Sequence, residues 1–264
     1  MMLADFHVHS TFSDGKLTIP AVIDLYGQRG FGAIAITDHV GESHTVIGKA
    51  AGHLGLSLTP ATFPLYIEIL KSEAERAWEQ YRMVVIPGVE LSKNSISNHR
   101  SAHILALGIS KYISADGDVA EIANTIRSHG AVSVAAHPVD SGKFEKQTYH
   151  LWNRREELAT AFDAWEVASG DRLFPEVLQS KLPKIASSDL HIARHMTSWK
   201  TLLDCERHPE AILEAIKCQE VQFRFYRDKG YDTTYIHHRR DIESIMGHRQ
   251  FHSASWDLGQ SAFQ

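Results

Sequence analysis

The sequence has few cysteines and no long apolar run, and both features narrow the classes of protein it can belong to. Its 264 residues include two cysteines, Cys205 and Cys218, which are too few for a disulfide framework and favour ordinary thiols. No apolar run reaches the roughly 20 residues that a membrane-spanning helix needs. The first residues lack the charged and apolar regions of a secretory signal, so we expect a cytoplasmic protein with no membrane partner.

The chain also lacks a basic charge excess, a glycine-rich phosphate loop and an internal repeat. A formal net charge of -5 gives no global field that would attract long nucleic acid, although a local basic patch remains open. The composition, with 43% hydrophobic and 22% charged residues, is that of a globular protein with a sizeable core. Histidine is unusually frequent for its type, at 17 positions.

Short apolar runs alternate with longer helical patterns along the chain. The runs are 3–6, 33–36, 84–86, 104–107, 132–136, 164–167, 184–186 and 221–225. The helical patterns are 18–30, 62–81, 118–129 and 209–217. Nearly continuous apolar runs are typical of parallel strands covered on both sides, and seven or eight strand-helix units fit a barrel better than an open sheet. We therefore expect a single α/β domain over 1–227, with an insertion at about 41–82 and a polar tail over 228–264.

Histidine, aspartate and glutamate recur near the ends of the predicted strands. In His7-Val8-His9, alternate residues of one strand point the same way, so two imidazoles can converge on a cation. Such a pair alone is more often an ordinary structural feature of a strand than a metal site. The later motifs are Ser13-Asp14-Gly15, Thr37-Asp38-His39, Pro87-Gly88-Val89-Glu90, His103 at the opening of a strand, Ala136-His137-Pro138 and Ser188-Asp189-Leu190-His191.

Taken as a set, these motifs predict a metal site. The strand ends of a parallel barrel share one face, where active sites are built, and carboxylates together with imidazoles suit Zn, Mn or Fe. Nine candidate donors exceed the roughly four that one tetrahedral ion takes. The sequence therefore implies two or three divalent ions, and we expect Glu90 to bridge two of them.

The order H-x-H, S-D-G, T-D-H, P-G-x-E, H, A-H-P and S-D-x-H resembles the PHP (polymerase and histidinol phosphatase) superfamily, especially its stand-alone phosphoesterases. The resemblance extends from Asp5 to about Phe225 and implies a distorted (βα)7 TIM-like barrel with a trinuclear site at the C-terminal strand ends. The metal ligands it implies are His7, His9, Asp14, His39, Glu90, His103, His137, Asp189 and His191. Asp14 stands where some members have a histidine.

The expected activity is hydrolysis of a phosphate ester by a metal-activated water. We assign catalytic roles to His39, Glu90 and His191. The expected substrate is a small phosphorylated molecule, such as a nucleotide or a short oligonucleotide. Phosphate is commonly held by Arg or Lys as well, and the expected substrate contacts are Arg194, His195 and Lys16. Further candidates are Lys93, Arg100, Lys143 and Lys200 for phosphate, Trp199 for stacking, and Glu166 as support for a ligand histidine.

Three alternatives stay open at this point. One is a histidinol-phosphate phosphatase, which differs in substrate alone. Another is a non-catalytic, metal-binding PHP module. The third is a metal-dependent amidohydrolase, which also opens with H-x-H but typically has a lysine ligand in mid-barrel, whereas this chain has Glu90 on its third predicted strand. The sequence gives no oligomeric state.

Overall fold

The computed structural model describes residues 1–94, 100–139, 149–228 and 251–252. The strands are β1 (Met2–Asp5), β2 (Ala33–Ile36), β3 (His39–Gly41), β4 (Val84–Lys93), β5 (Ala102–Leu107), β6 (Val132–Ala135), β7 (Ala164–Ser169), β8 (Arg172–Leu173), β9 (Lys184–Ser187), β10 (Ser198–Leu203), β11 (Val221–Tyr226) and β12 (Phe251–His252). The helices are α1 (Ile19–Gly27), α2 (Val46–His53), α3 (Phe63–Tyr81), α4 (Val119–Ser128), α5 (Tyr149–Asn153), α6 (Arg155–Leu158), α7 (Pro175–Gln179) and α8 (Pro209–Lys217), with a 3-10 helix at Ala193–Met196.

Local sequence signals set the helix ends where the chain was expected to turn. At the start of α4 the Asp118 carboxylate accepts the amide of Ala120 at 2.9 Å, and the amide of Asp118 donates to the Glu121 carboxylate at 3.1 Å. This capping box satisfies amides that the first helical turn leaves unpaired. The helix ends before Gly130, whose φ of +78° is a backbone conformation that glycine adopts without strain.

All the strands belong to one curled sheet of mixed direction. The strand order is β12-β11-β10-β1-β2-β4-β5-β6-β7-β8, with β3 also paired to β4 and β9 to β7. The pairs β1–β2, β2–β4, β6–β7 and β7–β9 are parallel. The pairs β4–β5, β5–β6 and β1–β10 are antiparallel. The α/β class is thus confirmed, but the expectation of parallel strands was wrong for β5, which is antiparallel to β4 and β6, and for β11, which is antiparallel to β10.

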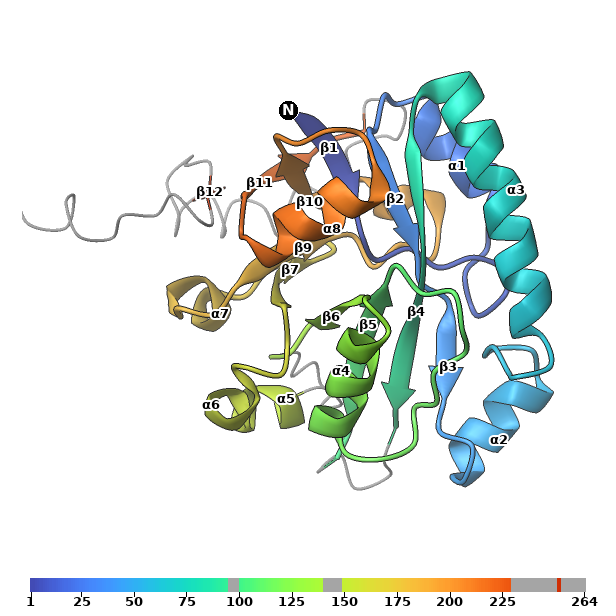
Figure 1. Ribbon diagram of the computed structural model, residues 1–264, viewed down its shortest axis with the longest axis vertical. Helices are drawn as coiled ribbons and strands as arrows, with labels where there is room; N and C mark the ends of the chain where they lie inside the picture. The colour runs from blue at the N-terminus through green and yellow to red at the C-terminus, as the bar shows by residue number, and fades with distance from the viewer. Residues whose placement is uncertain (95–99, 140–148, 229–250, 253–264) are drawn as a thin grey trace, which may run out of the picture.

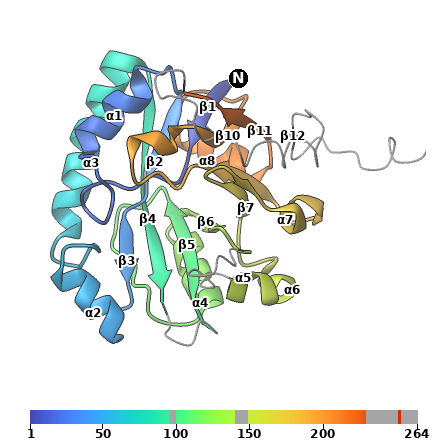
Figure 2. The same cartoon turned by 180° about the vertical axis from the view of Figure 1, so that it is seen from behind.

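The curl brings the end of β9 back to the end of β1. The amide of His9 donates to the carbonyl of Leu190 at 2.8 Å, and the amide of Leu190 donates to the carbonyl of His7 at 3.2 Å. In Figure 1, α1 and α3 cover the side of the sheet near β2 and β4, while α4 and α8 lie in front of it. Figure 2 shows the sheet from behind, with β4 and β5 side by side. The curl therefore joins the first and the late histidine motifs at one edge.

Helix α3 belongs to the body of the fold, although it falls in the segment expected to be an insertion. It connects the parallel strands β2 and β4 and packs against α1. The hydroxyl of its Tyr66 is fully buried, 2.9 Å from the carbonyl oxygen of Ile36 and 2.8 Å from that of Gly88. Tyr66 thus ties the end of β2, just before His39, to the part of β4 that carries Glu90.

Candidate metal centre

The structure brings all nine expected metal ligands to one edge of the curled sheet. Their donor atoms form four overlapping groups, within each of which every donor lies within 4.8 Å of the others. The groups are His9, Asp14, His39 and His191; His7, His137 and Asp189; His7, His9 and Glu90; and Glu90, His103 and His137. The shared members make these groups a single cluster rather than separate sites.

The carboxylate of Glu90 lies at the centre of this cluster. Its Oε2 atom lies 3.3 Å from Nε2 of His7, 3.3 Å from Nε2 of His9 and 3.0 Å from Nδ1 of His39. Its Oε1 atom lies 2.8 Å from Nδ1 of His103 and 3.3 Å from Nε2 of His137. The side chain is 1% exposed, so one buried carboxylate faces five imidazoles, and its two oxygens face different members of the cluster.

The antiparallel direction of β5 explains how His103 reaches the cluster. This histidine stands near the start of its strand, whereas His7, His137 and Asp189 follow the ends of β1, β6 and β9. Because β5 runs against β4, His103 lies beside Ser92 near the end of β4. A strand start and a strand end therefore meet at the same edge.

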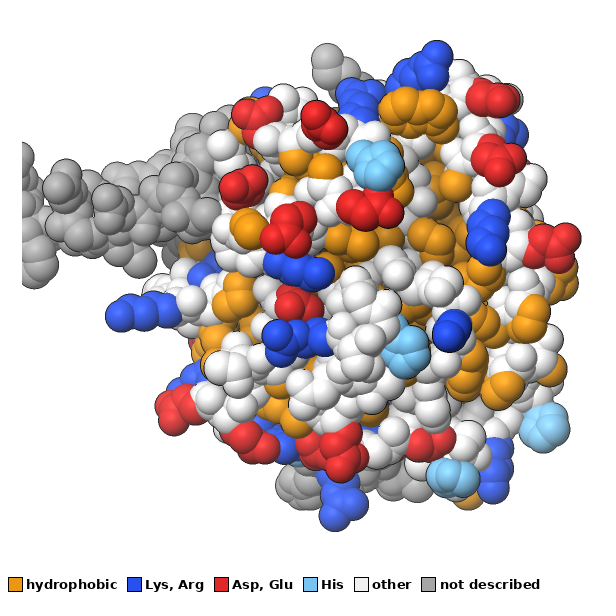
Figure 3. Space-filling model, in the orientation of Figure 1, with side chains coloured by type: hydrophobic (Ala, Val, Ile, Leu, Met, Phe, Trp, Pro, Cys, Tyr) orange, Lys and Arg blue, Asp and Glu red, His pale blue; other side chains and the backbone are white. Residues whose placement is uncertain are grey.

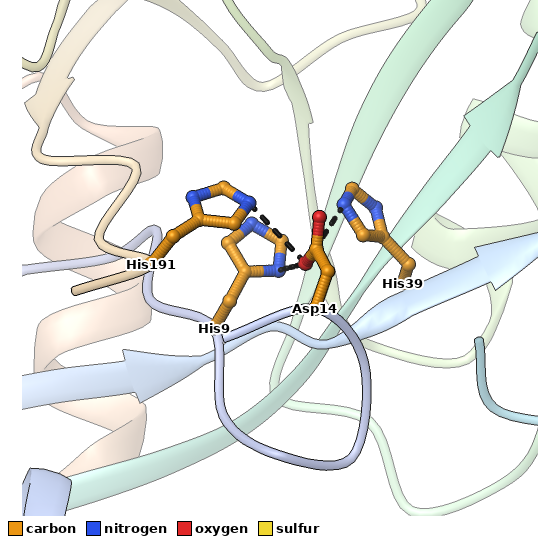
Figure 4. A group of neighbouring side chains, drawn as sticks. All are labelled: His9, Asp14, His39 and His191. Carbon is orange, nitrogen blue, oxygen red and sulfur yellow. Dashed lines mark ion pairs between the residues drawn. The ribbon is translucent and has the colours of Figure 1, made fainter. Parts of the chain in front are cut away.

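Asp14 lies on the open side of the cluster, held by the loop that follows β1. Its Oδ1 atom lies 3.3 Å from Nε2 of His191, 3.5 Å from Nε2 of His39 and 3.9 Å from Nδ1 of His9. Figure 4 shows the three rings pointing at this one oxygen. The turn at Gly15 is tight, since an added Cβ there would lie 2.6 Å from the carbonyl carbon and oxygen of His9.

Asp38 organises that loop, a role that its place in Thr37-Asp38-His39 did not predict. Its carboxylate accepts the amide of Ser10 at 2.8 Å, the hydroxyl of Ser10 at 2.6 Å and the hydroxyl of Ser13 at 2.6 Å. The side chain is fully buried. The two serines on one side of Asp14 and the aspartate before His39 were visible in the sequence, but their pairing depends on the fold.

Asp189 has a left-handed backbone conformation, with φ +52°. Its Oδ1 atom lies 3.4 Å from Nε2 of His7 and 3.3 Å from Nε2 of His9. The preceding residue is fixed from β1, because the amide of Ser188 donates to Oδ1 of Asp5 at 2.9 Å. A non-glycine residue at positive φ is uncommon and is maintained by such surrounding contacts.

Glu166, within β7, supports a ligand histidine, as expected. Its Oε1 atom lies 3.0 Å from Nδ1 of His7, and its Oε2 atom accepts the amide of His137 at 2.7 Å. A carboxylate on the far nitrogen of a ligand histidine fixes the ring and raises its basicity. The arrangement leaves Nε2 of His7 directed at the cluster.

Several buried polar atoms of the cluster converge without a hydrogen-bond partner among the described residues. They are Nε2 of His7, Nε2 of His9, Oδ1 of Asp14 and Oε2 of Glu90. An unsatisfied buried polar atom is costly. The atoms of His7 and His9 both lie 3.3 Å from that of Glu90, and such a converging group fits a bound cation. The donor set of imidazole nitrogens and carboxylate oxygens fits divalent Zn, Mn or Fe.

The carboxylates and histidines shift one another's protonation. Burial lowers the pKa of His39, but Glu90 and Asp14 outweigh it and raise that pKa to about 10. Burial likewise lowers the pKa of His191, whereas Asp14 and Asp189 raise it to about 9. Burial raises the pKa of Glu90, yet the surrounding histidines hold it well below its usual range. Carboxylates therefore stay ionised here, as metal ligands must.

A cavity of about 320 Å³ opens over the cluster. Every expected ligand except His7 and His9 contributes to its lining. The rest of the lining comes from β4, from Asn94 and from the segment that runs from β3 through α2 to Ser57. The cluster is thus accessible from one side to a small molecule.

The three expected substrate contacts stand around His191 but are not part of this lining. The side chains of Lys16 and Arg194 are exposed. The backbone amide of Lys16 donates to the carbonyl of His191 at 2.8 Å, and the amide of His191 donates to Nδ1 of His195 at 3.3 Å. Their roles toward a substrate stay predictions.

The other cation candidates are placed elsewhere. Lys200 is fully buried, with Nζ 2.9 Å from Oδ2 of Asp5, so it does not face a phosphate. Lys93 pairs with Glu42. Arg100 is exposed, Trp199 is buried in the core, and Lys143 lies outside the described residues.

Comparison with known proteins identifies a family. Residues 5–173 match the PHP domain family. Over 108 residues the chain is 31% identical to the phosphoribosyl 1,2-cyclic phosphate 1,2-diphosphodiesterase of Eggerthella lenta. That match covers 41% of this chain and 31% of the relative, so the chain spans less than a third of that protein.

Solved structures show a similar fold. A two-domain protein of Bacteroides vulgatus containing a predicted PHP-like metal-dependent phosphoesterase superposes with a TM-score of 0.65 at 22% identity. The match covers 85% of this chain and 65% of that one. PsfC of Pseudomonas syringae superposes with a TM-score of 0.58 at 15% identity, covering 92% of this chain and 96% of that one.

Proposed function

Because the chain belongs to the PHP domain family, we propose that it is a metal-dependent phosphoesterase, a hydrolase of phosphoric ester bonds. The single observation that carries this proposal is the Glu90 carboxylate, buried among five imidazoles within 3.3 Å. A structural core has no need of so many titratable groups around one anion, whereas a multinuclear cation site does.

We propose that the nine clustered side chains hold two or three divalent ions, with the distorted (βα)7 barrel of the family as their scaffold. Such ions supply an acidified water and offset the charge of the reacting phosphate. Glu90, with its two oxygens facing different ligand groups, would fix two ions relative to each other. His39 and His191 line the cavity and would hold the ion nearest the substrate. These three residues form the proposed catalytic group.

The proposed substrate is a small phosphate ester, for which we favour a nucleotide or a short oligonucleotide over long nucleic acid. A cavity of about 320 Å³ is at the lower end of the range for small-molecule sites, about 300–1,000 Å³. The net charge is -5. Acidic and basic side chains lie interspersed on the face seen in Figure 3. Lys16, Arg194 and His195 remain the proposed substrate contacts beside His191.

The cyclic phosphodiester named for the Eggerthella lenta relative is a second candidate substrate. A test set should therefore contain nucleoside mono- and bisphosphates, short oligonucleotides, histidinol phosphate and a five-membered cyclic phosphate. Hydrolysis of p-nitrophenyl phosphate but not of amides or lactones would separate this proposal from an amidohydrolase. Bound metal without turnover of any ester would instead support a non-catalytic module.

Replacement of His7, Glu90 or Asp189 by Ala should abolish metal-dependent hydrolysis and leave the fold largely intact. Each of the three residues contacts other members of the cluster. Each lies at the edge of the sheet where the cluster forms, not in the apolar core between the sheet and the helices. The measurement is the rate of p-nitrophenyl phosphate hydrolysis in Mn or Zn, with circular dichroism as the test of folding. A control is His208→Ala, since this side chain is 65% exposed. Full activity in any of the three cluster variants would refute the assignment.

The proposed cellular location is the cytoplasm. Within the part of the chain that the structure describes, no helix has both the length and the apolar character to span a bilayer.

A further inference from the structure

The segment between β3 and α3 forms one wall of the cavity, and part of that wall is an apolar surface. Its side chains Ile47 and Ala51 lie four residues apart on α2, and hence on one face of the helix. With Leu56 they line the same cavity as His39, Glu90 and Asp189. Ile47 is 39% exposed and Leu56 is 43% exposed, so apolar carbon faces the space above the metal cluster.

The wall is fixed to the ligand strand. The amide of Leu58 donates to the carbonyl of His39 at 2.7 Å, and the amide of Gly41 donates to the hydroxyl of Ser57 at 2.7 Å. An added Cβ on Gly48 would lie 1.9 Å from the carbonyl oxygen of Glu42, which shows how closely the helix approaches the strand. The apolar face therefore has a set position relative to His39.

The other side of the wall is also held. The amide and the hydroxyl of Ser43 donate to the two carboxylate oxygens of Asp116 at 3.0 and 2.7 Å. Lys93 donates to Glu42 and, at 3.1 Å, to the carbonyl of Ala115. Glu42 itself lines the cavity, so a carboxylate whose charge is balanced from behind stands at the edge of the apolar surface.

We propose that this wall binds the organic group of the phosphate ester and selects esters with an apolar, ring-containing organic group. The inference rests on the proposed function, because it takes the phosphate to lie at the metal cluster. An organic group seated against Ile47, Ala51 and Leu56 removes exposed apolar surface from water. Glu42 offers an acceptor to a hydroxyl or amine on the same group. Esters with a short polar organic group gain neither contact.

The chain supplies matched pairs of residues for the test. Val46 and Ile47 are neighbours on α2, and Leu54 and Leu56 are near neighbours after it, but only the second of each pair lines the cavity. Val46 is 83% exposed and Leu54 is 72% exposed. The variants are Ile47→Asn and Leu56→Asn, with Val46→Asn and Leu54→Asn as controls. Asparagine adds polarity without the charge that would repel a phosphate.

The experiment measures binding of phenylphosphonate and methylphosphonate to the metal-loaded full chain by calorimetry. The wild type should bind phenylphosphonate about tenfold or more tightly than methylphosphonate, in line with apolar contacts in a pocket. Ile47→Asn and Leu56→Asn should bring that ratio close to one, and the two controls should keep it. Metal content should be the same in all five proteins.

A second measurement separates this inference from the proposed function. It compares kcat/KM for phenyl phosphate with that for glycerol phosphate in the same proteins. Two results would overturn the proposed role of the wall and leave the proposed function intact. One is hydrolysis of both esters with no preference for phenyl phosphate, and the other is an equal loss of that preference in Ile47→Asn and Val46→Asn. The protein could instead hydrolyse no ester and still prefer phenylphosphonate, with that preference lost in the two cavity variants. This result would support the proposed role of the wall in binding and overturn the proposed function.

Discussion

Glu90 is the residue that forms ion-pair contacts with the largest number of the candidate metal ligands. It was expected to bridge ions from its place in Pro87-Gly88-Val89-Glu90, and the structure puts it within 3.3 Å of five imidazoles. Its identity as a candidate ligand could be predicted from the sequence, because its carboxylate comes soon after a buried apolar run, although β4 continues past it to Lys93. The residues behind the ligands were harder to find: Asp38 and Asp5 act through contacts with loops far away in the chain.

The protonation of His39 and His191 leads to a prediction about pH. Burial lowers the pKa of both histidines, but nearby carboxylates outweigh it in the metal-free protein. Glu90 and Asp14 raise the pKa of His39 from 6.5 to about 10, and Asp14 and Asp189 raise that of His191 to about 9. A raised pKa means that the folded state binds the proton more tightly than the unfolded state. The stabilisation is complete below about pH 6.5 and is lost as the pH rises through 9 to 10. Metal binding requires neutral imidazoles, so metal affinity should rise over the same range.

Thermal unfolding in a chelator and metal titration at several pH values test this directly. The metal-free wild type should lose a few degrees of Tm between pH 7 and pH 10, while its affinity for Zn or Mn increases and binding releases protons. His191→Asn should show a weaker dependence of Tm on pH, and His208→Asn, at an exposed position, should match the wild type. Equal pH dependence in His191→Asn and the wild type would contradict the explanation.

Among the elements, strands with continuous apolar runs were predictable, whereas a strand whose apolar run is interrupted by a charged residue was not. The run 33–36 corresponds to β2, whose four residues are all buried. Strand β10 was missed because Lys200 interrupts its pattern, and a lysine is usually at the surface. Here Lys200 is buried against Asp5 of the neighbouring strand β1. Single-sequence periodicity cannot show that pairing, nor can it show that β5 runs antiparallel.

The Lys200–Asp5 pair makes a prediction for stability. Replacement of Lys200 by Met leaves the buried Asp5 carboxylate without its cation, which should cost about 3–5 kcal/mol. The double variant Asp5→Asn with Lys200→Met should recover part of that loss, because no uncompensated charge remains. Urea unfolding of the metal-free proteins measures both values. If Lys200→Met is as stable as the wild type, the pair does not hold β1 to β10 in the way described.

For the whole molecule, the order of motifs along the chain was enough to predict one site, and the curled sheet explains why. Residues of β3 and β4, the start of β5 and the segments that follow β1, β6 and β9 meet at one edge. These residues are up to 184 positions apart, from His7 to His191. The shape of the cavity could not be predicted. The shape depends on how α2 folds back toward β3. The short apolar stretch of α2 has no periodicity that distinguishes a substrate-binding wall from an ordinary surface helix.

The most direct measurement is the metal content of the purified full chain together with its hydrolysis of p-nitrophenyl phosphate before and after chelation. The explanation predicts two or three divalent ions per chain, loss of hydrolysis when they are removed, and recovery when Mn or Zn is returned. Hydrolysis that continues at the same rate in fully metal-free protein would contradict it.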